Sequence, residues 1–158
     1  MPFKSITEFA KAKAEHRPVS MVTCYDYTMA RLVAQSPVDC VLIGDSGGMV
    51  AAGYDTTVPV TVDEIIWFEK AVRRGAPGAF IVADMPFLSY HAGPEDAVRN
   101  AGRIMKEAGV NAVKLEGGRE FSDEIRALVR ASIPVVGHLG FTPQSVHMIG
   151  GNKVQGRG

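Results

Sequence analysis

The sequence has few cysteines, no excess of charge of either sign and no long hydrophobic run. Its two cysteines, Cys24 and Cys40, lie in apolar stretches. We therefore expect buried free thiols in a reducing compartment, with a disulfide between the two as the open alternative. Lys and Arg together number 17, as do Asp and Glu, and this balance argues against a nucleic acid or an anionic membrane surface as partner. No apolar run approaches the length of a membrane span and the N-terminal segment lacks an apolar core, so we expect a cytoplasmic protein without a signal peptide.

The residues that are present have the composition of an ordinary globular protein. Hydrophobic residues make up 46% and charged residues 22% of the 158 residues, which is enough chain for one domain with a sizeable core. Near-continuous apolar runs recur along this chain, and such runs are typical of strands that are covered on both faces, as in a parallel sheet. The predicted strands are residues 19–24, 38–43, 79–83, 111–116 and 134–138.

Helix signals separate these strands. Ser5 with Glu8, and Thr61 with Glu64, have the spacing of a capping box at a helix N-terminus. Proline near the start and glycine near the end bound further helices. The predicted helices are residues 6–16, 27–34, 62–75, 94–108 and 123–130, with Asp26 and Ser122 as N-caps of the second and the last. Residues 46–59 and 139–158 show no convincing helical or strand period, and we expect loops there.

The alternation of strands and helices predicts consecutive βα units around a parallel sheet. Two architectures are open, a doubly wound sheet and a (β/α)8 TIM barrel. No Gly-x-Gly-x-x-Gly follows the first strand, and polar residues at four consecutive strand ends favour the barrel. A barrel typically takes about 250 residues, so we expect only about the first five βα units here. Residues 1–158 would then form a single partial barrel domain, in which residues 1–17 provide a helix before the first strand.

The polar residues at the strand ends are the candidate site. Asp45, Asp84, Lys114, Glu116 and His138 each follow or end an apolar run. Carboxylates from separate strands are hard oxygen donors that suit Mg²⁺, whereas no His and Cys cluster with zinc spacing is present. Lys114 and Glu116 are two residues apart on one strand, so they face the same side. A metal and this lysine together would stabilise an enolate formed beside a substrate carboxylate.

Each of these residues also has a purely structural interpretation. Asp45 alone is more often a turn former or a helix cap than a metal ligand. The spacing of Lys114 and Glu116 fits a structural ion pair as well as it fits a functional site. His138 is more often a hydrogen-bonded core histidine than a base, and His91 and His147 are expected in loops. The pattern by itself favours a metal-assisted lyase or transferase.

Several motifs, taken in chain order, resemble the ketopantoate (3-methyl-2-oxobutanoate) hydroxymethyltransferase family. The resemblance runs from about residue 19 to residue 158, and Gly47, where the family usually has leucine, departs from it. The motifs that carry it are TCYDY (23–27), GDS (44–46), PVTV (59–62), AVRRGA (71–76), ADMPF (83–87), VKLEGG (113–118) and GHLGFTPQ (137–144).

The resemblance implies a TIM barrel of the phosphoenolpyruvate/pyruvate-type superfamily and a large homo-oligomer. It implies transfer of a hydroxymethyl group from 5,10-methylenetetrahydrofolate to 3-methyl-2-oxobutanoate, which gives 2-dehydropantoate for pantothenate and coenzyme A biosynthesis. By the same resemblance Asp45, Asp84 and Glu116 hold Mg²⁺, and Asp45, Ser46, Asp84 and Lys114 bind the keto acid. The family's general base, a glutamate, belongs to chain beyond Gly158, so no residue here is assigned as catalytic.

Two other functions stay open on the sequence. One is a metal-dependent keto-acid aldolase or lyase that uses no folate. The other is a catalytically inactive half-barrel with an interaction role, since five strands leave sheet edges unpaired.

Overall fold

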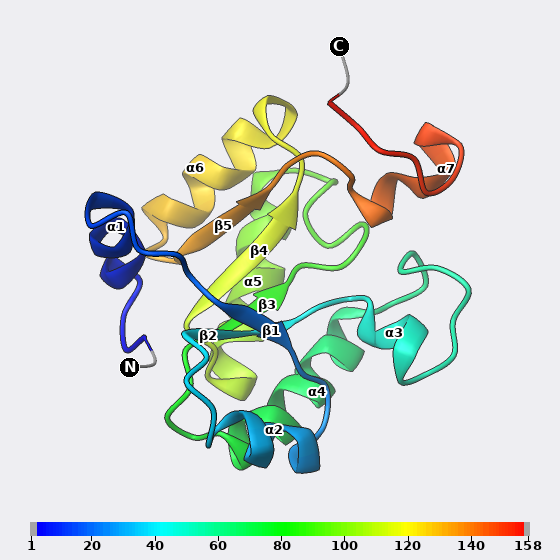
Figure 1. Ribbon diagram of the computed structural model, residues 1–158. Helices are drawn as coiled ribbons and strands as arrows, with labels where there is room; N and C mark the ends of the chain where they lie inside the picture. The colour runs from blue at the N-terminus through cyan, green and yellow to red at the C-terminus, as the bar shows by residue number, and fades with distance from the viewer. Residues whose placement is uncertain (1–2, 157–158) are drawn as a thin grey trace.

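The computed structural model describes residues 3–156, and its centre is a five-stranded parallel sheet (Figure 1). The strands lie side by side in the order in which they occur in the chain. They are β1 (Met21–Thr23), β2 (Cys40–Ile43), β3 (Ile81–Asp84), β4 (Ala112–Glu116) and β5 (Val135–His138). All five predicted strands are confirmed, and each is one to three residues shorter than its apolar run.

The strand order decides between the two architectures. A doubly wound sheet reverses its order at a switch point, whereas this sheet runs from β1 to β5 without a reversal. Neighbouring helices contact each other around the outside of the sheet, as in a barrel wall (Figure 1). These helices are α2 (Tyr27–Val33), α4 (Val62–Gly75), α5 (Pro94–Ala108) and α6 (Ser122–Arg130). In the described residues β1 and β5 each pair on one side only, so the wall is open and the fold is the first part of a (β/α)8 barrel.

The two faces of the sheet have separate cores. Val113 and Leu115 of β4 point toward the helix layer and pack in one cluster with Ile104 of α5 and Leu128 of α6. A smaller cluster covers the other face near the amino ends of the strands, where α1 (Thr7–Ala14) closes the barrel floor. Its aromatic members, Phe3, Phe9 and Phe80, pack edge to face in sequence. The carboxyl ends of the strands are therefore left for polar side chains.

Two helix starts form the hydrogen bonds that the sequence predicted, whereas the capping box predicted at Ser5 is incomplete. The N-cap of α1 is Ile6, and the Ser5 hydroxyl bonds to the hydroxyl of Thr7 and not to a backbone amide of the helix. Thr61 and Glu64 form both hydrogen bonds of a capping box at the start of α4. The carboxylate of Asp26 accepts a hydrogen bond from the Met29 amide at the start of α2. Gly109 ends α5 in the left-handed conformation at φ 73°, where a side chain would be strained. Cys24 and Cys40 are buried and free, as predicted.

Three further local predictions were wrong. Residues 46–59 contain a helical turn, α3 (Gly47–Val50), because Gly47 and Gly48 let the backbone pack directly against the rings of Tyr25 and Tyr54. Ser122 is not an N-cap, because the 3₁₀ turn η1 (Arg119–Phe121) runs directly into α6.

The third correction concerns the end of the chain. Residues 139–156 fold into the 3₁₀ turn η2 (Pro143–Ser145) and the short helix α7 (Val146–Ile149), so His147 lies on a helix and not in a loop. Residues 157–158 of this predicted loop lie outside the described residues. Within residues 3–156, no helix combines the length and the apolar character that crossing a bilayer requires.

Candidate active site

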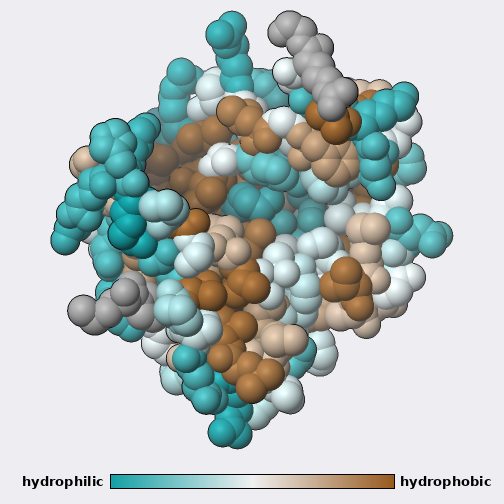
Figure 2. Space-filling model, in the orientation of Figure 1, coloured by the Kyte–Doolittle hydropathy of each residue, from teal (hydrophilic) through white to brown (hydrophobic). Residues whose placement is uncertain are grey.

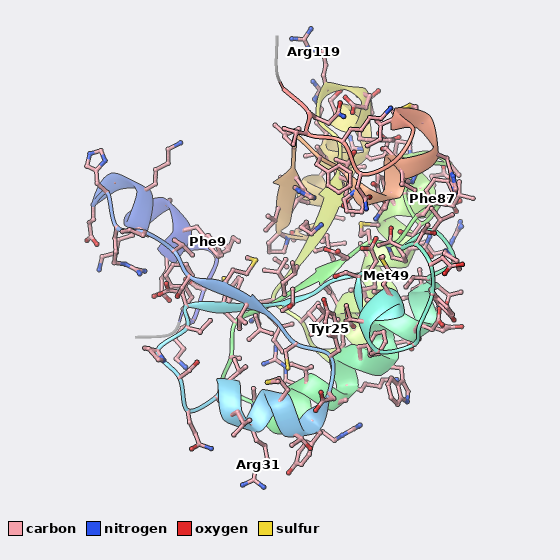
Figure 3. The ribbon with its side chains drawn as sticks, turned by 45° about the vertical axis from the view of Figure 1, so that its right-hand side comes forward. Phe9, Tyr25, Arg31, Met49, Phe87 and Arg119 are labelled. Atoms are coloured by element: carbon pink, nitrogen blue, oxygen red, sulfur yellow. The ribbon has the colours of Figure 1, made fainter. Side chains whose placement is uncertain are left out.

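All five predicted strand-end residues lie at the same edge of the sheet. Asp45 follows β2, Asp84 ends β3, Lys114 and Glu116 belong to β4, and His138 ends β5. The parallel register places Asp84 beside Lys114 and Glu116 beside His138. In Figure 3 the labelled residues of the carboxyl-end loops, Tyr25, Met49 and Phe87, lie on the side of the sheet away from Phe9 of α1.

Lys114 joins the carboxylates of two strands. Its Nζ lies 3.0 Å from Oδ1 of Asp84 and 3.8 Å from Oε1 of Glu116, and only 10% of its side chain is exposed. Oδ1 of Asp84 is buried, and the ammonium group of Lys114 is the donor group that it contacts. The cluster therefore contains a buried carboxylate oxygen with unused capacity to bind a cation or a donor.

Asp45 and Ser46 reach the same cluster from the loop after β2. The backbone amide of Asp45 donates a hydrogen bond of 3.0 Å to Oδ2 of Asp84. The hydroxyl of Ser46 lies 2.7 Å from that of Tyr25, and both hydroxyls and Oδ2 of Asp84 surround the position that a Cβ on Gly44 would take. Gly44 is needed here because a Cβ would lie 2.8 Å from the Ser46 hydroxyl oxygen.

His138 completes the cluster at its more open side. Its Nδ1 lies 3.2 Å from Oε1 of Glu116, and 37% of its side chain is exposed. The imidazole therefore contacts one of the proposed metal ligands and also faces solvent. His91 does not join the cluster, because it packs against Tyr90 at a ring distance of 4.0 Å.

Two buried residues of the cluster were missed in the sequence analysis. Gln144 in η2 donates from Nε2 to Oδ2 of Asp45 at 2.7 Å, and its backbone amide donates to Oε2 of Glu116 at 3.0 Å. The hydroxyl of Tyr90 lies 2.9 Å from Oε1 of Gln144 and 3.0 Å from the carbonyl oxygen of Glu116. No local pattern marks a glutamine as a site residue, and its position after the GHLGFTP run was the only available signal.

The electrostatics of the cluster favour an added positive charge. The cluster contains three carboxyl groups and a single lysine, so ionisation of all three carboxyls gives it an excess of negative charge. Burial, and then the neighbouring charge of Asp84, raise the pKa of Asp45 to about 6, although Gln144 and Lys114 oppose the rise. Burial likewise raises the pKa of Asp84 and of Glu116, again against the charge of Lys114. A divalent cation would remove this repulsion and hold the carboxylates in their ionised form.

The donor chemistry fits a hard cation such as Mg²⁺, but the carboxylates are not yet arranged around a common ion. Among residues 3–156, no three or more His, Cys, Asp or Glu side chains are grouped closely enough to hold a metal as they stand. Lys114 lies between Asp84 and Glu116, and Gln144 joins Asp45 to Glu116. Mg²⁺ binds carboxylate oxygens together with water or substrate oxygens, so the donor type of the cluster suits it.

A cavity of about 470 Å³ opens beside the cluster. Its polar wall includes Glu116, Glu120 and Gln144, and its aromatic wall includes Phe87 and Phe121. In Figure 2 the hydrophilic floor of a hollow is bordered by apolar surface, with the two colours meeting within the same depression. A separate groove of about 510 Å³ between α5 and α6 contains none of the predicted site residues.

Comparison with known proteins shows which family the sequence resembles. The family model described as ketopantoate hydroxymethyltransferase matches residues 4–158. The chain is 58% identical over 154 residues to 3-methyl-2-oxobutanoate hydroxymethyltransferase of Geobacillus kaustophilus, covering 98% of this chain and 55% of the relative. It is 57% identical over 153 residues to the protein of the same name from Clostridium beijerinckii, covering 97% and 56%. The chain thus spans about half the length of the curated relatives it matches.

Solved structures support the fold. A 2,3-dimethylmalate lyase, described as a PEP mutase/isocitrate lyase superfamily member, matches with a TM-score of 0.60 at 15% identity, over 87% of this chain and 53% of that one. An oxaloacetate acetylhydrolase matches with a TM-score of 0.61 at 18% identity, over 87% and 53%. At this identity the likeness concerns the fold alone, and it places this sheet within about half of a longer barrel chain.

Proposed function

The chain belongs to the ketopantoate hydroxymethyltransferase family, and we propose that it forms the N-terminal part of an enzyme that transfers a hydroxymethyl group from 5,10-methylenetetrahydrofolate to 3-methyl-2-oxobutanoate. The product would be 2-dehydropantoate, a precursor of pantothenate and coenzyme A. The observation that carries the proposal is the convergence of Asp45, Asp84, Lys114 and Glu116 at one edge of the sheet. A keto acid needs this combination of a cationic partner for its carboxylate and a charge acceptor at its keto oxygen.

In this proposal Asp45, Asp84 and Glu116 hold Mg²⁺, and the burial of these carboxylates beside a single lysine supports it. The ion, when bound, supplies positive charge where negative charge develops on the keto oxygen. Lys114 neutralises the substrate carboxylate from its position beside Asp84 and Glu116. The Ser46 hydroxyl, held by Tyr25, offers a hydrogen bond at the rim of the same space.

The one-carbon donor needs space beside the keto acid. We place it in the cavity next to Glu116, because about 470 Å³ is more than a five-carbon acid fills and part of its wall is aromatic. A general base is not assigned in this chain, so residues 1–158 alone are expected to bind the keto acid without turnover. Residues 1–158 as one partial barrel domain, the large homo-oligomer and the cytoplasmic location stay predictions.

Calorimetric titration of the chain with 3-methyl-2-oxobutanoate in the presence of Mg²⁺ tests the proposal. We expect binding that is abolished in Asp45→Asn and Asp84→Asn, and unchanged in Asp123→Asn, whose carboxylate pairs with Arg126 on the exposed face of α6. Binding that survives both cluster variants would contradict it. Product formed from the keto acid without a folate donor would favour the aldolase or lyase instead. Absence of any keto-acid binding would favour a half-barrel with an interaction role.

A further inference from the structure

Gln144 makes three side-chain hydrogen bonds within the cluster and has no role in the proposed chemistry. It comes from η2, after β5, yet it reaches the ends of three other strands and is only 4% exposed. Its Nε2 donates to Oδ2 of Asp45 at 2.7 Å and to the carbonyl oxygen of Met85 at 3.0 Å. Its backbone amide donates to Oε2 of Glu116. A buried glutamine with all these bonds made is a rigid connection between segments that are distant in sequence.

The orientation of the Gln144 amide is fixed by its surroundings. Nε2 faces a carboxylate and a carbonyl, which both accept hydrogen bonds, so the amide cannot be reversed without two repulsive contacts. Its Oε1 then faces the hydroxyl of Tyr90 at 2.9 Å. That hydroxyl is itself held by the backbone of Glu116, which offers both its carbonyl oxygen and its amide. The acceptors at Asp45 and Met85 therefore set the direction in which Gln144 donates, and the single hydroxyl proton of Tyr90, shared between Oε1 of Gln144 and the Glu116 carbonyl oxygen, supports that direction.

As a result, one oxygen of each of the three carboxylates, Asp45, Asp84 and Glu116, accepts a hydrogen bond from an amide group. Gln144 fixes Oδ2 of Asp45 through its side chain and Oε2 of Glu116 through its backbone, and the Asp45 amide fixes Oδ2 of Asp84. The opposite oxygens of Asp84 and Glu116 both face Lys114, on the inner side of the cluster. Hydrogen bonds of this kind orient carboxylate ligands and are commonly worth a factor of about 10 to 100 in metal affinity.

We propose that Gln144 is a positioning residue, held by Tyr90, that orients Asp45 and Glu116 so that both carboxylates bind one divalent cation. This inference depends on the metal site of the proposed function, but not on the folate or the keto acid. The proposal predicts that a substitution of Gln144 affects the two carboxylates differently. Replacing the side chain of Gln144 releases Asp45, whereas Glu116 keeps its bond to the backbone amide.

Mn²⁺ binding to the 158-residue chain, followed by electron paramagnetic resonance, tests the inference without turnover. We expect Gln144→Leu to weaken Mn²⁺ binding by about tenfold while circular dichroism shows a folded chain. Gln35→Leu is the control, because the Gln35 side chain is exposed and donates to the carbonyl oxygen of Arg31 in the preceding helix, α2, away from the cluster. Gln144→Leu binding Mn²⁺ within about twofold of the wild type would overturn the inference.

A double-mutant cycle separates positioning from a general structural role. If Gln144 acts through Asp45, adding Gln144→Leu to Asp45→Asn should weaken Mn²⁺ binding by less than about twofold further. Fully additive losses would overturn the inference.

Should Gln144→Leu fail to fold, Tyr90→Phe is the second variant, because it keeps the ring and removes the hydroxyl. We expect Tyr90→Phe to lower the affinity for Mn²⁺ by about threefold or more, and Tyr27→Phe, at an exposed tyrosine, to leave it unchanged. No loss in Tyr90→Phe would then overturn it. A wild-type chain that binds no Mn²⁺ overturns the metal site as well, whereas normal Mn²⁺ binding by the variants overturns the role of Gln144 alone.

Discussion

Lys114 and Asp84 are direct partners in the register of β4 and β3, and the ammonium Nζ lies 3.0 Å from Oδ1 of the carboxylate. Both side chains are nearly inaccessible, so neither charge is compensated by bulk water. Removing one member of a buried pair leaves the other charge without a partner, which typically costs about 3–5 kcal/mol. The pair of Lys114 and Asp84 therefore contributes to the stability of the fold and also belongs to the proposed site.

Lys114→Met is expected to lower the free energy of unfolding by about 3 kcal/mol at neutral pH, and by less in mild acid. The pH dependence follows because burial already raises the pKa of Asp84, so protonation relieves the unpaired charge as the pH falls. Urea denaturation at about pH 5 and pH 7 measures both quantities. Lys11→Met is the matched control, since Lys11 pairs with Glu15 on an exposed helix surface, and it should change stability by under about 0.5 kcal/mol. Equal losses in the two variants would contradict the account.

Glu69 is a second buried acid, and it lies outside the cluster on α4. Its side chain is fully buried and neither carboxyl oxygen has a hydrogen bond. Burial, followed by the charge of Glu107, raises the pKa of Glu69 from 4.5 to about 9. The folded chain therefore favours the protonated acid, and stability is lost as the pH rises from the unfolded pKa toward the folded one.

We expect Glu69→Gln to be more stable than the wild type at neutral pH. The advantage should grow by about 1.4 kcal/mol for each pH unit between about pH 5 and pH 8, because the wild type must ionise or stay protonated at a cost. Urea midpoints of the two chains across this range give the slope. Glu95→Gln, on the exposed first turn of α5, should show no such slope. A pH-independent difference between Glu69→Gln and the wild type would show that Glu69 ionises normally.

The crossing of α2 and α4 depends on a single glycine. A Cβ on Gly75 would lie 2.6 Å from both the Ala30 Cβ and the Tyr27 carbonyl oxygen, and backbone cannot move aside as a flexible side chain can. Gly75→Ala should therefore destabilise the chain by about 1–3 kcal/mol. Gly102 lies within α5 with open space around it, so Gly102→Ala should stabilise by about 0.5–1 kcal/mol through helix propensity. Thermal unfolding of the two variants should show shifts of opposite sign, and shifts of the same sign would contradict this packing.

Much of the fold was predictable because its signals are local. The capping box of Thr61 and Glu64, the N-cap Asp26 and the terminal Gly109 each act within one helical turn. The meeting of Asp45, Asp84 and Glu116 was predictable because parallel strands end at one edge.

What the sequence did not reveal depends on contacts between distant segments. Gln144 bonds to Asp45 across 99 positions of chain, and no pattern encodes that approach. Arg73 lies at the C-terminal end of α4, and its guanidinium bonds to the carbonyl of Gly109 and to the side chain of Asn111 before β4, contacts that no local pattern predicts. Gly47 and Gly48 have low helix propensity, yet they form a helical turn because their packing against Tyr25 and Tyr54 decides the conformation.

The central claim is that Asp45, Asp84 and Glu116 act on one divalent cation. The stoichiometry and affinity of Mn²⁺ for the chain, measured beside Asp45→Asn, Asp84→Asn and Glu116→Gln, test it most directly. We expect one tightly bound ion per chain and a loss of affinity of at least about tenfold in each of the three variants. Unchanged Mn²⁺ affinity in any one of them would contradict it, because that carboxylate would then not be a ligand of the shared ion.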